Sequence, residues 1–489
     1  MPMTRSRSTF EFAISPRLSE EGRGDWLVET IRSAIQSGKL RPGQSLPSTR
    51  ELTKGLRLAR GTIISAIERL KDEGYLKSIP GSKTFVANVL PEKFLSRSLP
   101  PVAVHSGHSK PVALSEYGKR LRPVRYYAQP RTIAFRVNLP ALDLFPIDLW
   151  TKMAAKKWRG ASTSLLLGGE PFGYLPLRTS LSSYLRTSRS IICDPEQVLI
   201  TSGIQEALDL STRILVSAGD SVLMEDPGYQ VAFAGFEAAG ARIVSLSVDN
   251  EGAVPPTKAG LRARLMYITP GHQFPTGATM SYRRRMQILR YAHTEGTCIF
   301  EDDYDSEFRF EGSPLPALHG LDSKAQVIFA GSFNKTLFPS LRLGYMVVPH
   351  GLVDAFKMCK SISCRHHPWG DQAILHAFIE EGHYVRHLRR MRKVYSERLQ
   401  LLADEVRKHL EGALELLPVE AGMQTVGWLR TGQNPEDIAA LALEENVDVI
   451  PLSRYCYRRQ VPPGLQIGFG GVDGKSILQG VQILAKLIS

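Results

Sequence analysis

Two short segments of this 489-residue chain carry side chains that together could hold an organic cofactor. Lys335 offers an amine that can form an imine, and Asp302 offers a carboxylate that can keep a pyridine nitrogen protonated. Tyr304 can donate a hydrogen bond to a ring oxygen beside the imine. Ser332 and Arg342 flank the lysine, and arginine can grip a phosphate with two parallel hydrogen bonds. These residue types and spacings indicate a site for pyridoxal phosphate.

A third segment could complete the phosphate site. Residues 197–200 are apolar and strand-like, and a short turn leads from them into a helix. The first backbone N–H groups of a helix are unpaired and lie at its positive end, so Gly203, Ile204 and Gln205 are candidate phosphate contacts. Tyr229 is either an aromatic surface for the cofactor ring or a core residue.

The acidic cluster after the strand-like residues 298–300 has two possible roles. In extended chain Asp302 and Tyr304 point to the same side, which suits a carboxylate and a hydroxyl on one ring. The alternative is a divalent-metal site built from Asp302, Asp303 and Asp305. That alternative lacks the glycine and the distal glutamate of a calcium loop, so we predict the cofactor and no metal.

The N-terminal part of the chain has a different charge balance. Residues 1–130 hold 22 Lys and Arg against 11 Asp and Glu, whereas residues 131–489 hold 39 against 37. Such asymmetry predicts a polyanion partner for the N-terminal part, and a merely soluble basic surface would not concentrate the charge there.

The same N-terminal part has the pattern of a winged helix-turn-helix. Apolar residues recur at helical spacing over residues 25–37 and 60–73, and Ser48 is a suitable N-cap for a short helix between them. Residues 80–83 form a turn before a strand at 84–86. Two helices joined by a tight turn and followed by a hairpin are typical of DNA-binding domains.

The start of the third helix is expected to enter the major groove of DNA, because that is how such domains read bases. A small helical domain with a solvated basic face is the alternative. The expected base contacts are Arg60, Gly61 and Thr62, the expected phosphate contacts are Arg50 and Lys83, and Ser82 in the wing tip is a further expected DNA contact.

These patterns divide the chain into three parts. Residues 12–87 form the DNA-binding domain, residues 88–131 a proline-containing linker without helical or strand period, and residues 132–489 an α/β domain. Apolar strand-sized runs alternate with helical stretches in the last part, which predicts a largely parallel sheet with ligands at its carboxyl edge.

The composition also indicates a cellular compartment. The five cysteines form no Cys-x-x-Cys pair, and nothing in their spacing suggests a disulfide framework. The N-terminus lacks the apolar region of a secretory signal, and no apolar stretch is long enough to span a bilayer. We therefore expect a cytoplasmic protein without a membrane partner.

The motifs resemble two known families. Residues 38–43, 46–52 and 60–63 are similar to the DNA-binding domain of the GntR regulators, and residues 132–489 resemble fold-type I aminotransferases. The whole chain therefore looks like the MocR subfamily of GntR regulators. By this resemblance, Asp302 holds the pyridine nitrogen, Tyr304 the ring oxygen and Lys335 the aldimine. The resemblance assigns the phosphate to Ser332, Arg342, Gly203, Ile204 and Gln205.

The chain departs from both families at several positions. Ala59 stands where the regulators commonly have a serine that caps the third helix or contacts phosphate, and Lys83 stands where they have glycine. Phe274 replaces the asparagine that aminotransferases place before Pro-Thr-Gly. Gln466 replaces their substrate-carboxylate arginine, for which Arg454 is the nearest substitute by motif position.

The resemblance implies a PLP-dependent transcription regulator. It would sense a small amine or amino acid, or the cofactor level itself, through imine exchange at Lys335. The alternatives are a working aminotransferase with a DNA-binding appendage and a binding protein without a cofactor. Aminotransferase-like domains pair across a two-fold axis, so we expect a homodimer on a double-stranded operator with two repeats. A linker of about 44 residues could span well over ~100 Å.

Overall fold

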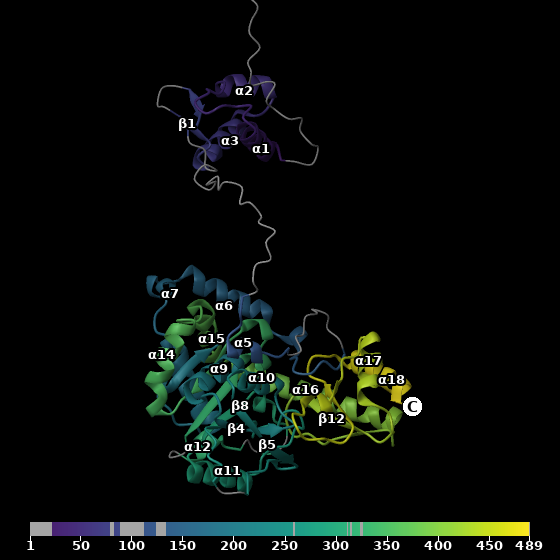
Figure 1. Ribbon diagram of the computed structural model, residues 1–489. Coiled ribbons are helices and arrows are strands. Elements are labelled where there is room, and N and C mark those ends of the chain that lie inside the picture. Colours follow the sequence, from purple (N-terminus) through teal and green to yellow (C-terminus); the bar gives the residue numbers. More distant parts are fainter. Residues whose placement is uncertain are drawn as a thin grey trace, which may run out of the picture. The chain divides into compact units, whose positions relative to one another are not determined.

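The computed structural model describes residues 22–78, 83–88, 112–123, 134–257, 260–310, 312, 315–322 and 326–488. The chain divides into two compact units, residues 1–111 and 112–489 (Figure 1). The second unit therefore takes in part of the segment predicted to be a linker. Within the described residues, no helix combines the length and the apolar composition needed to cross a membrane.

The first unit has the predicted winged helix-turn-helix architecture. Its elements are α1 (Arg23–Gln36), α2 (Thr49–Leu56), α3 (Arg60–Asp72), β1 (Leu76–Ser78) and β2 (Thr84–Val86). The two strands pair antiparallel, with Leu76 opposite Val86. Apolar side chains from all three helices and from both strands form one core. The hairpin turn, including Ser82, lies outside the described residues.

The two helices of the DNA-reading motif begin differently. Ser48 caps α2: its hydroxyl accepts a hydrogen bond from the Glu51 N–H, and the Glu51 carboxylate accepts one from the Ser48 N–H. Ala59 stands at the N-cap of α3 and offers no side-chain hydrogen bond. The sequence-based expectation of a missing cap is confirmed, and the first N–H groups of α3 remain open to another acceptor.

The second unit is built on an eight-stranded sheet with the order β3-β10-β9-β8-β7-β4-β5-β6. Its strands are β3 (Val198–Thr201), β4 (Ser221–Asp226), β5 (Arg242–Asp249), β6 (Gly252–Ala253), β7 (Leu265–Ile268), β8 (Cys298–Asp303), β9 (Val327–Ser332) and β10 (Gly344–Val347). The strands from β9 through β8, β7 and β4 to β5 are parallel. The short strand β10 runs antiparallel to both β3 and β9, an exception that the sequence did not reveal.

Helices cover both faces of this sheet (Figure 1). Apolar residues of α9 (Ile204–Leu215), α10 (Gln230–Ala238) and α14 (Val353–Ser363) pack in one core cluster with strands of the sheet. Residues of α11 (Tyr282–Glu295) and α12 (Leu318–Leu321) belong to a separate cluster that includes Ile299 and Val327. Further helices are α6 (Ile147–Arg159), α7 (Thr163–Leu167), α8 (Leu175–Arg189), α13 (Phe333–Thr336) and α15 (Trp369–Glu380).

A smaller α/β part follows along the chain. The long helix α16 (His383–Leu410) leads into a four-stranded sheet with the order β11-β12-β14-β13. The remaining elements are β11 (Leu414–Leu416), β12 (Gln424–Leu429), β13 (Ile450–Pro451), β14 (Gly464–Gly468), α17 (Pro435–Glu444) and α18 (Gly474–Ile488).

The segment predicted to be an unstructured linker contains a short helix. Helix α5 (Glu116–Arg120) is capped by Ser115 and packs against α10. Arg122 forms an ion pair with Glu237 of α10, with 3.2 Å between Nε and Oε2. Five residues are too few to show a helical period, so the sequence pattern could not reveal this helix.

The open N-terminus of α3 leads to a stability prediction. Ala59 has the extended backbone typical of an N-cap, so Ala59→Ser should stabilise the first turn of α3 by about 1 kcal/mol. Hydrogen exchange of the α3 amides should slow accordingly. The control is Ser48→Ala, which should speed exchange in α2 by a similar factor. Unchanged exchange in Ala59→Ser would contradict the prediction.

Candidate cofactor site and nucleic-acid interface

Asp302 lies near the carboxyl end of β8 with almost no solvent exposure. One carboxylate oxygen, Oδ2, accepts a hydrogen bond of 2.6 Å from the hydroxyl of Tyr267 on β7. The other oxygen, Oδ1, is buried and has no hydrogen-bond partner in the part of the chain that the structure describes. Burial raises the pKa of Asp302 to about 7, although the Tyr267 hydrogen bond opposes the shift. A cationic partner at Oδ1 would restore the charged form.

Lys335 lies in α13, directly after β9, and its side chain is close to the carboxylates of Asp302 and Asp305. Its Nζ donates a hydrogen bond of 2.9 Å to the main-chain carbonyl of Asn138. Burial lowers the pKa of Lys335 to about 8, while Asp305 and Asp302 act in the opposite direction. A lysine with this pKa is partly uncharged near neutral pH and can act as a nucleophile.

Tyr304 takes part in a network that the sequence did not predict. Its hydroxyl lies 3.0 Å from His272 Nδ1, and that nitrogen lies 2.9 Å from the Asp305 carboxylate. The carboxylate can only accept a hydrogen bond, so Nδ1 carries the proton. Tyr304 can then only accept from His272, and its own proton stays available for a ligand oxygen. His272 was missed because its partners lie more than 30 residues away in sequence.

Two of the candidate phosphate contacts, Gly203 and Ser332, lie together at the N-terminus of α9. Gly203 has φ +126°, a conformation that favours glycine, and a Cβ there would lie 3.8 Å from Ser332 Oγ. Gln205 Nε2 donates a hydrogen bond of 3.2 Å to the hydroxyl of Tyr229, which links the turn to the candidate ring contact. Arg342 directly follows a short 3-10 turn with a left-handed backbone and is exposed.

A buried ionic group supports this turn. Glu206 Oε2 accepts a hydrogen bond of 2.6 Å from the Ser202 N–H and lies 2.5 Å from His367 Nε2. The fully buried ammonium of Lys360 bonds both Glu206 and His367. Cys364 brings a third potential metal ligand within 4.8 Å of these groups. Lys360 already supplies positive charge there, and the hydrogen bond from Ser202 to Glu206 connects this group to the turn before α9.

Aromatic side chains form one wall of the site. Phe274 packs edge-on against Tyr229, Tyr304 and Tyr455, with ring centroids 6.0, 5.9 and 5.0 Å away. Phe274 occupies the position at which aminotransferases commonly have asparagine. A phenyl ring can pack against a ligand but cannot donate a hydrogen bond to it.

The two residues considered for a ligand carboxylate have different surroundings. Arg454 is exposed, and both Nε (2.8 Å) and the terminal nitrogen (2.5 Å) of its guanidinium donate to Glu436 Oε2. Gln466 is fully buried on β14. The structure does not bring Arg454 into contact with the groups around Lys335, and its ligand-binding role remains a prediction.

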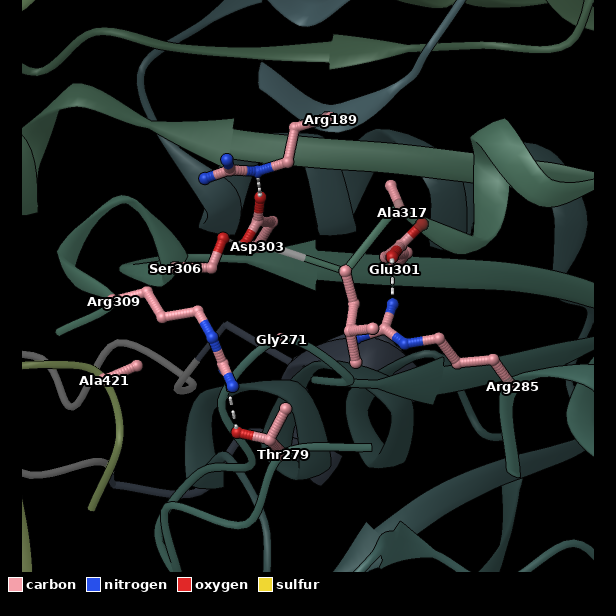
Figure 2. A pocket seen from close by; sticks show the side chains of 11 residues that line it. Arg189, Gly271, Thr279, Arg285, Glu301, Asp303, Ser306, Arg309, Ala317 and Ala421 are labelled. Carbon is pink, nitrogen blue, oxygen red and sulfur yellow. Dashed lines mark hydrogen bonds and ion pairs between the residues drawn. The ribbon is translucent and has the colours of Figure 1, made fainter. Parts of the chain in front are cut away.

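The other carboxylates near the end of β8 point to different partners. Arg189 from α8 donates a hydrogen bond of 2.5 Å to Asp303, and Arg285 from α11 lies 3.8 Å from Glu301. Figure 2 shows these two pairs and Arg309. The three arginines line a small cavity of about 30 Å³. Asp302, Asp303 and Asp305 therefore have three separate partners, which argues against the alternative metal site.

The predicted DNA contacts are accessible in the first unit. Arg50, Arg60, Gly61 and Lys83 are exposed, and Thr62 is half-buried. Arg60 and Gly61 lie in the first turn of α3, and nothing crowds the position of a Gly61 Cβ. Hydrogen bonds from Ser48 lower the pKa of Glu51 on α2, and the positive charge of Lys83 acts in the same direction. Their roles on DNA remain predictions, and Ser82 is outside the described residues.

Comparisons with known proteins match both parts of the chain. Residues 25–86 match the family "Bacterial regulatory proteins, gntR family". The chain is 36% identical to the probable rhizopine catabolism regulatory protein MocR of Rhizobium meliloti, over 94% of this chain and 92% of that protein. It is 28% identical to the HTH-type pyridoxine biosynthesis transcriptional regulator PdxR of Corynebacterium glutamicum, over 91% and 92% of the two chains.

Solved structures match the second unit. The α-aminoadipate aminotransferase LysN of Thermus thermophilus, complexed with N-(5'-phosphopyridoxyl)-L-leucine, has a TM-score of 0.71 and 27% identity over 77% of this chain and 97% of that chain. The kynurenine aminotransferase of Pyrococcus horikoshii has a TM-score of 0.67 and 26% identity over 73% and 90%. A winged helix-turn-helix domain joined to a fold-type I aminotransferase domain defines a class of transcription regulators. This chain belongs to the MocR subfamily of the GntR regulators.

The lowered pKa of Lys335 can be measured by its reactivity. Trace acetylation of the cofactor-free protein, followed by peptide mass spectrometry, should give a half-maximal rate for Lys335 near pH 8. Ordinary lysines, with a pKa of about 10.4, are the internal reference. Asp302→Asn removes a carboxylate that favours the ammonium, so the midpoint should fall in that variant. A midpoint above that of the reference lysines would contradict the proposed burial.

Proposed function

We propose that this regulator binds pyridoxal phosphate in its second unit and adjusts its DNA binding to a small amine or to cofactor supply. The observation that carries the proposal is the buried Oδ1 of Asp302, which has no partner among the described residues. A protonated ring nitrogen would supply that partner. Similarity to structures that hold pyridoxyl compounds supports the same ligand here.

The residues of the site fit the parts of this cofactor. When bound, the cofactor supplies an aldehyde that condenses reversibly with amines. Lys335 is the amine of the protein, and its lowered pKa favours the reactive form. Tyr304 keeps a proton for the ring oxygen. Ser332, Arg342 and the first N–H groups of α9 are the proposed phosphate contacts.

The contacts that would couple ligand binding to DNA affinity begin at Lys335 and Tyr229. A ligand amine that competes with Lys335 for the cofactor aldehyde would leave the Lys335 Nζ free. Tyr229 is the N-cap of α10, and α10 also contacts α5 and pairs with Arg122 through Glu237. A ligand that favours one arrangement of these contacts changes DNA affinity by linkage.

The proposed regulator is a homodimer that binds two operator repeats. Leu167 on α7 and Ile362 on α14 are 75% and 87% exposed. A Cβ on Gly168 would lie 2.5 Å from His366, so the end of α7 and the segment after α14 lie together. Such exposed apolar surface suits a second copy of the chain, and two linked DNA-binding domains gain from effective concentration. Sedimentation equilibrium that returned only the 54.3 kDa monomer would overturn this proposal.

The cofactor proposal can be tested by reductive trapping. The protein incubated with pyridoxal phosphate should show a visible absorbance band, and borohydride should fix the cofactor on the peptide that contains Lys335. Lys335→Ala should abolish this adduct, whereas Lys357→Ala, which removes an exposed lysine of α14, should retain it. Equal trapping by the parent and Lys335→Ala would show that the lysine assignment is wrong. Steady transamination without DNA would favour the aminotransferase alternative instead.

The DNA assignment predicts different effects for two residues. Arg60→Ala should weaken binding to the cognate site by roughly 1–3 kcal/mol and relax its sequence preference. Lys83→Ala should weaken cognate and random DNA alike and flatten the salt dependence, because a phosphate contact carries no sequence information. Fluorescence anisotropy titrations at several salt concentrations would measure both. An equal loss on both DNAs for Arg60→Ala would make it a phosphate contact.

A further inference from the structure

Gln466 lies at a defined position in the small sheet. It is on β14, directly opposite Val426 of β12 on one side and Ile450 of β13 on the other. Directly opposite residues in neighbouring strands present their side chains on the same face of a sheet. Gln466 therefore shares a face with Val426 and Ile450.

That face adjoins the candidate cofactor site. Val426 and Ile450 pack in one apolar cluster with Phe274, Tyr304 and Tyr455. Gln466 Nε2 is also directed toward the carbonyl oxygen of the residue that follows Phe274, at 3.4 Å. The Gln466 amide therefore lies beside Phe274 and Tyr304.

The amide of Gln466 leaves one acceptor unused. Its side chain is fully buried, and Oε1 has no hydrogen-bond partner within the described ranges. Exchanging the two amide atoms would place Oε1 against the carbonyl of Pro275, where two acceptors would repel each other. The contact with Pro275 therefore favours this orientation, in which Oε1 can be satisfied by a ligand that donates a hydrogen bond.

The charges around the site disfavour a ligand carboxylate. Of the groups that shift the pKa of Lys335 in the described part of the chain, Asp302 and Asp305 are carboxylates and Arg342 is the cation. Arg342 is the proposed phosphate contact. Arg454 is exposed and already holds Glu436 with two hydrogen bonds. A ligand carboxylate would also face Gln466 Oε1, and neither group can donate.

We propose that the effector is a primary amine that carries a neutral hydrogen-bond donor, such as a hydroxyl group, and no carboxylate. Its amine engages the Lys335 site, its hydroxyl donates to Gln466 Oε1, and its carbon skeleton packs against Phe274 and Tyr455. This inference rests on the proposed function, because the amine must compete with Lys335.

Three amines with the same cyclohexane ring separate the contribution of a hydroxyl group from that of a carboxylate. The probes are trans-2-aminocyclohexanol, cyclohexylamine and trans-2-aminocyclohexanecarboxylate, titrated into the full-length protein loaded with pyridoxal phosphate. The absorbance change gives an apparent dissociation constant, and calorimetry gives an independent one. The amino alcohol should bind at least tenfold more tightly than either of the other two. Tighter binding of the carboxylate would overturn the inference and leave amine sensing intact.

Two variants test the role of Gln466. Gln466→Leu should remove the preference for the amino alcohol over cyclohexylamine while both still bind. Gln466→Arg should reverse the preference toward the carboxylate. Circular dichroism and the cofactor band check that each variant is folded, and Gln433→Leu is a control away from β14. An unchanged preference in folded Gln466→Leu would overturn the assignment.

One more variant distinguishes the remaining outcomes. If the carboxylate bound well and Arg454→Ala abolished that binding, Arg454 would be the carboxylate contact and the inference would be wrong. If none of the three amines changed the absorbance of the loaded protein, amine sensing itself would fail. Sensing of cofactor supply would then be the surviving form of the proposed function.

Discussion

Four carboxylates in five residues at the end of β8 are the constraint around which the second unit is arranged. Like charges so close together, and so deeply buried, cannot all remain ionised without separate partners. Asp303 turns to Arg189 and Glu301 to Arg285, while Asp305 reaches His272. These partners come from α8, from α11 and from the segment after β7. Of these four carboxylates, only Asp302 has a buried oxygen without a hydrogen-bond partner among the described residues.

This arrangement explains why an aminotransferase fold can serve a regulator. The residues proposed to hold a cofactor are a buried carboxylate, a lysine with a lowered pKa and a glycine turn at the start of α9. The parts that would bind an ordinary amino acid are altered, since Phe274 and Gln466 replace polar groups of the enzymes. Such a site can retain reversible binding of an amine without being shaped for turnover. The 36% sequence identity to the MocR regulator of Rhizobium meliloti over 94% of this chain agrees with a site kept for binding and not for turnover.

Sequence patterns predicted the residues of the candidate site but not the groups that contact them. Lys335 and Asp302 could be recognised because each follows an apolar strand and has diagnostic neighbours within a few residues. Tyr267 and His272 could not, because their partners are 35 and 33 residues away and are set by the strand order. Glu206 and Lys360 are separated by 154 residues and meet only through helix packing. The helices and hairpin of the first unit were predictable because their packing is local.

The docking of α5 on α10 shortens the tether between the two units. Between Val86 at the end of β2 and Glu116 at the start of α5 lie 29 residues, fewer than the 44 predicted for the linker. A chain of that length spans at most about 100 Å when fully extended. In the proposed dimer, this length limits how far each DNA-binding domain can lie from α5 of its own chain. Operator repeats farther apart than that would require the DNA to bend or α5 to detach from α10. The spacing of the repeats would then affect how strongly the proposed dimer binds.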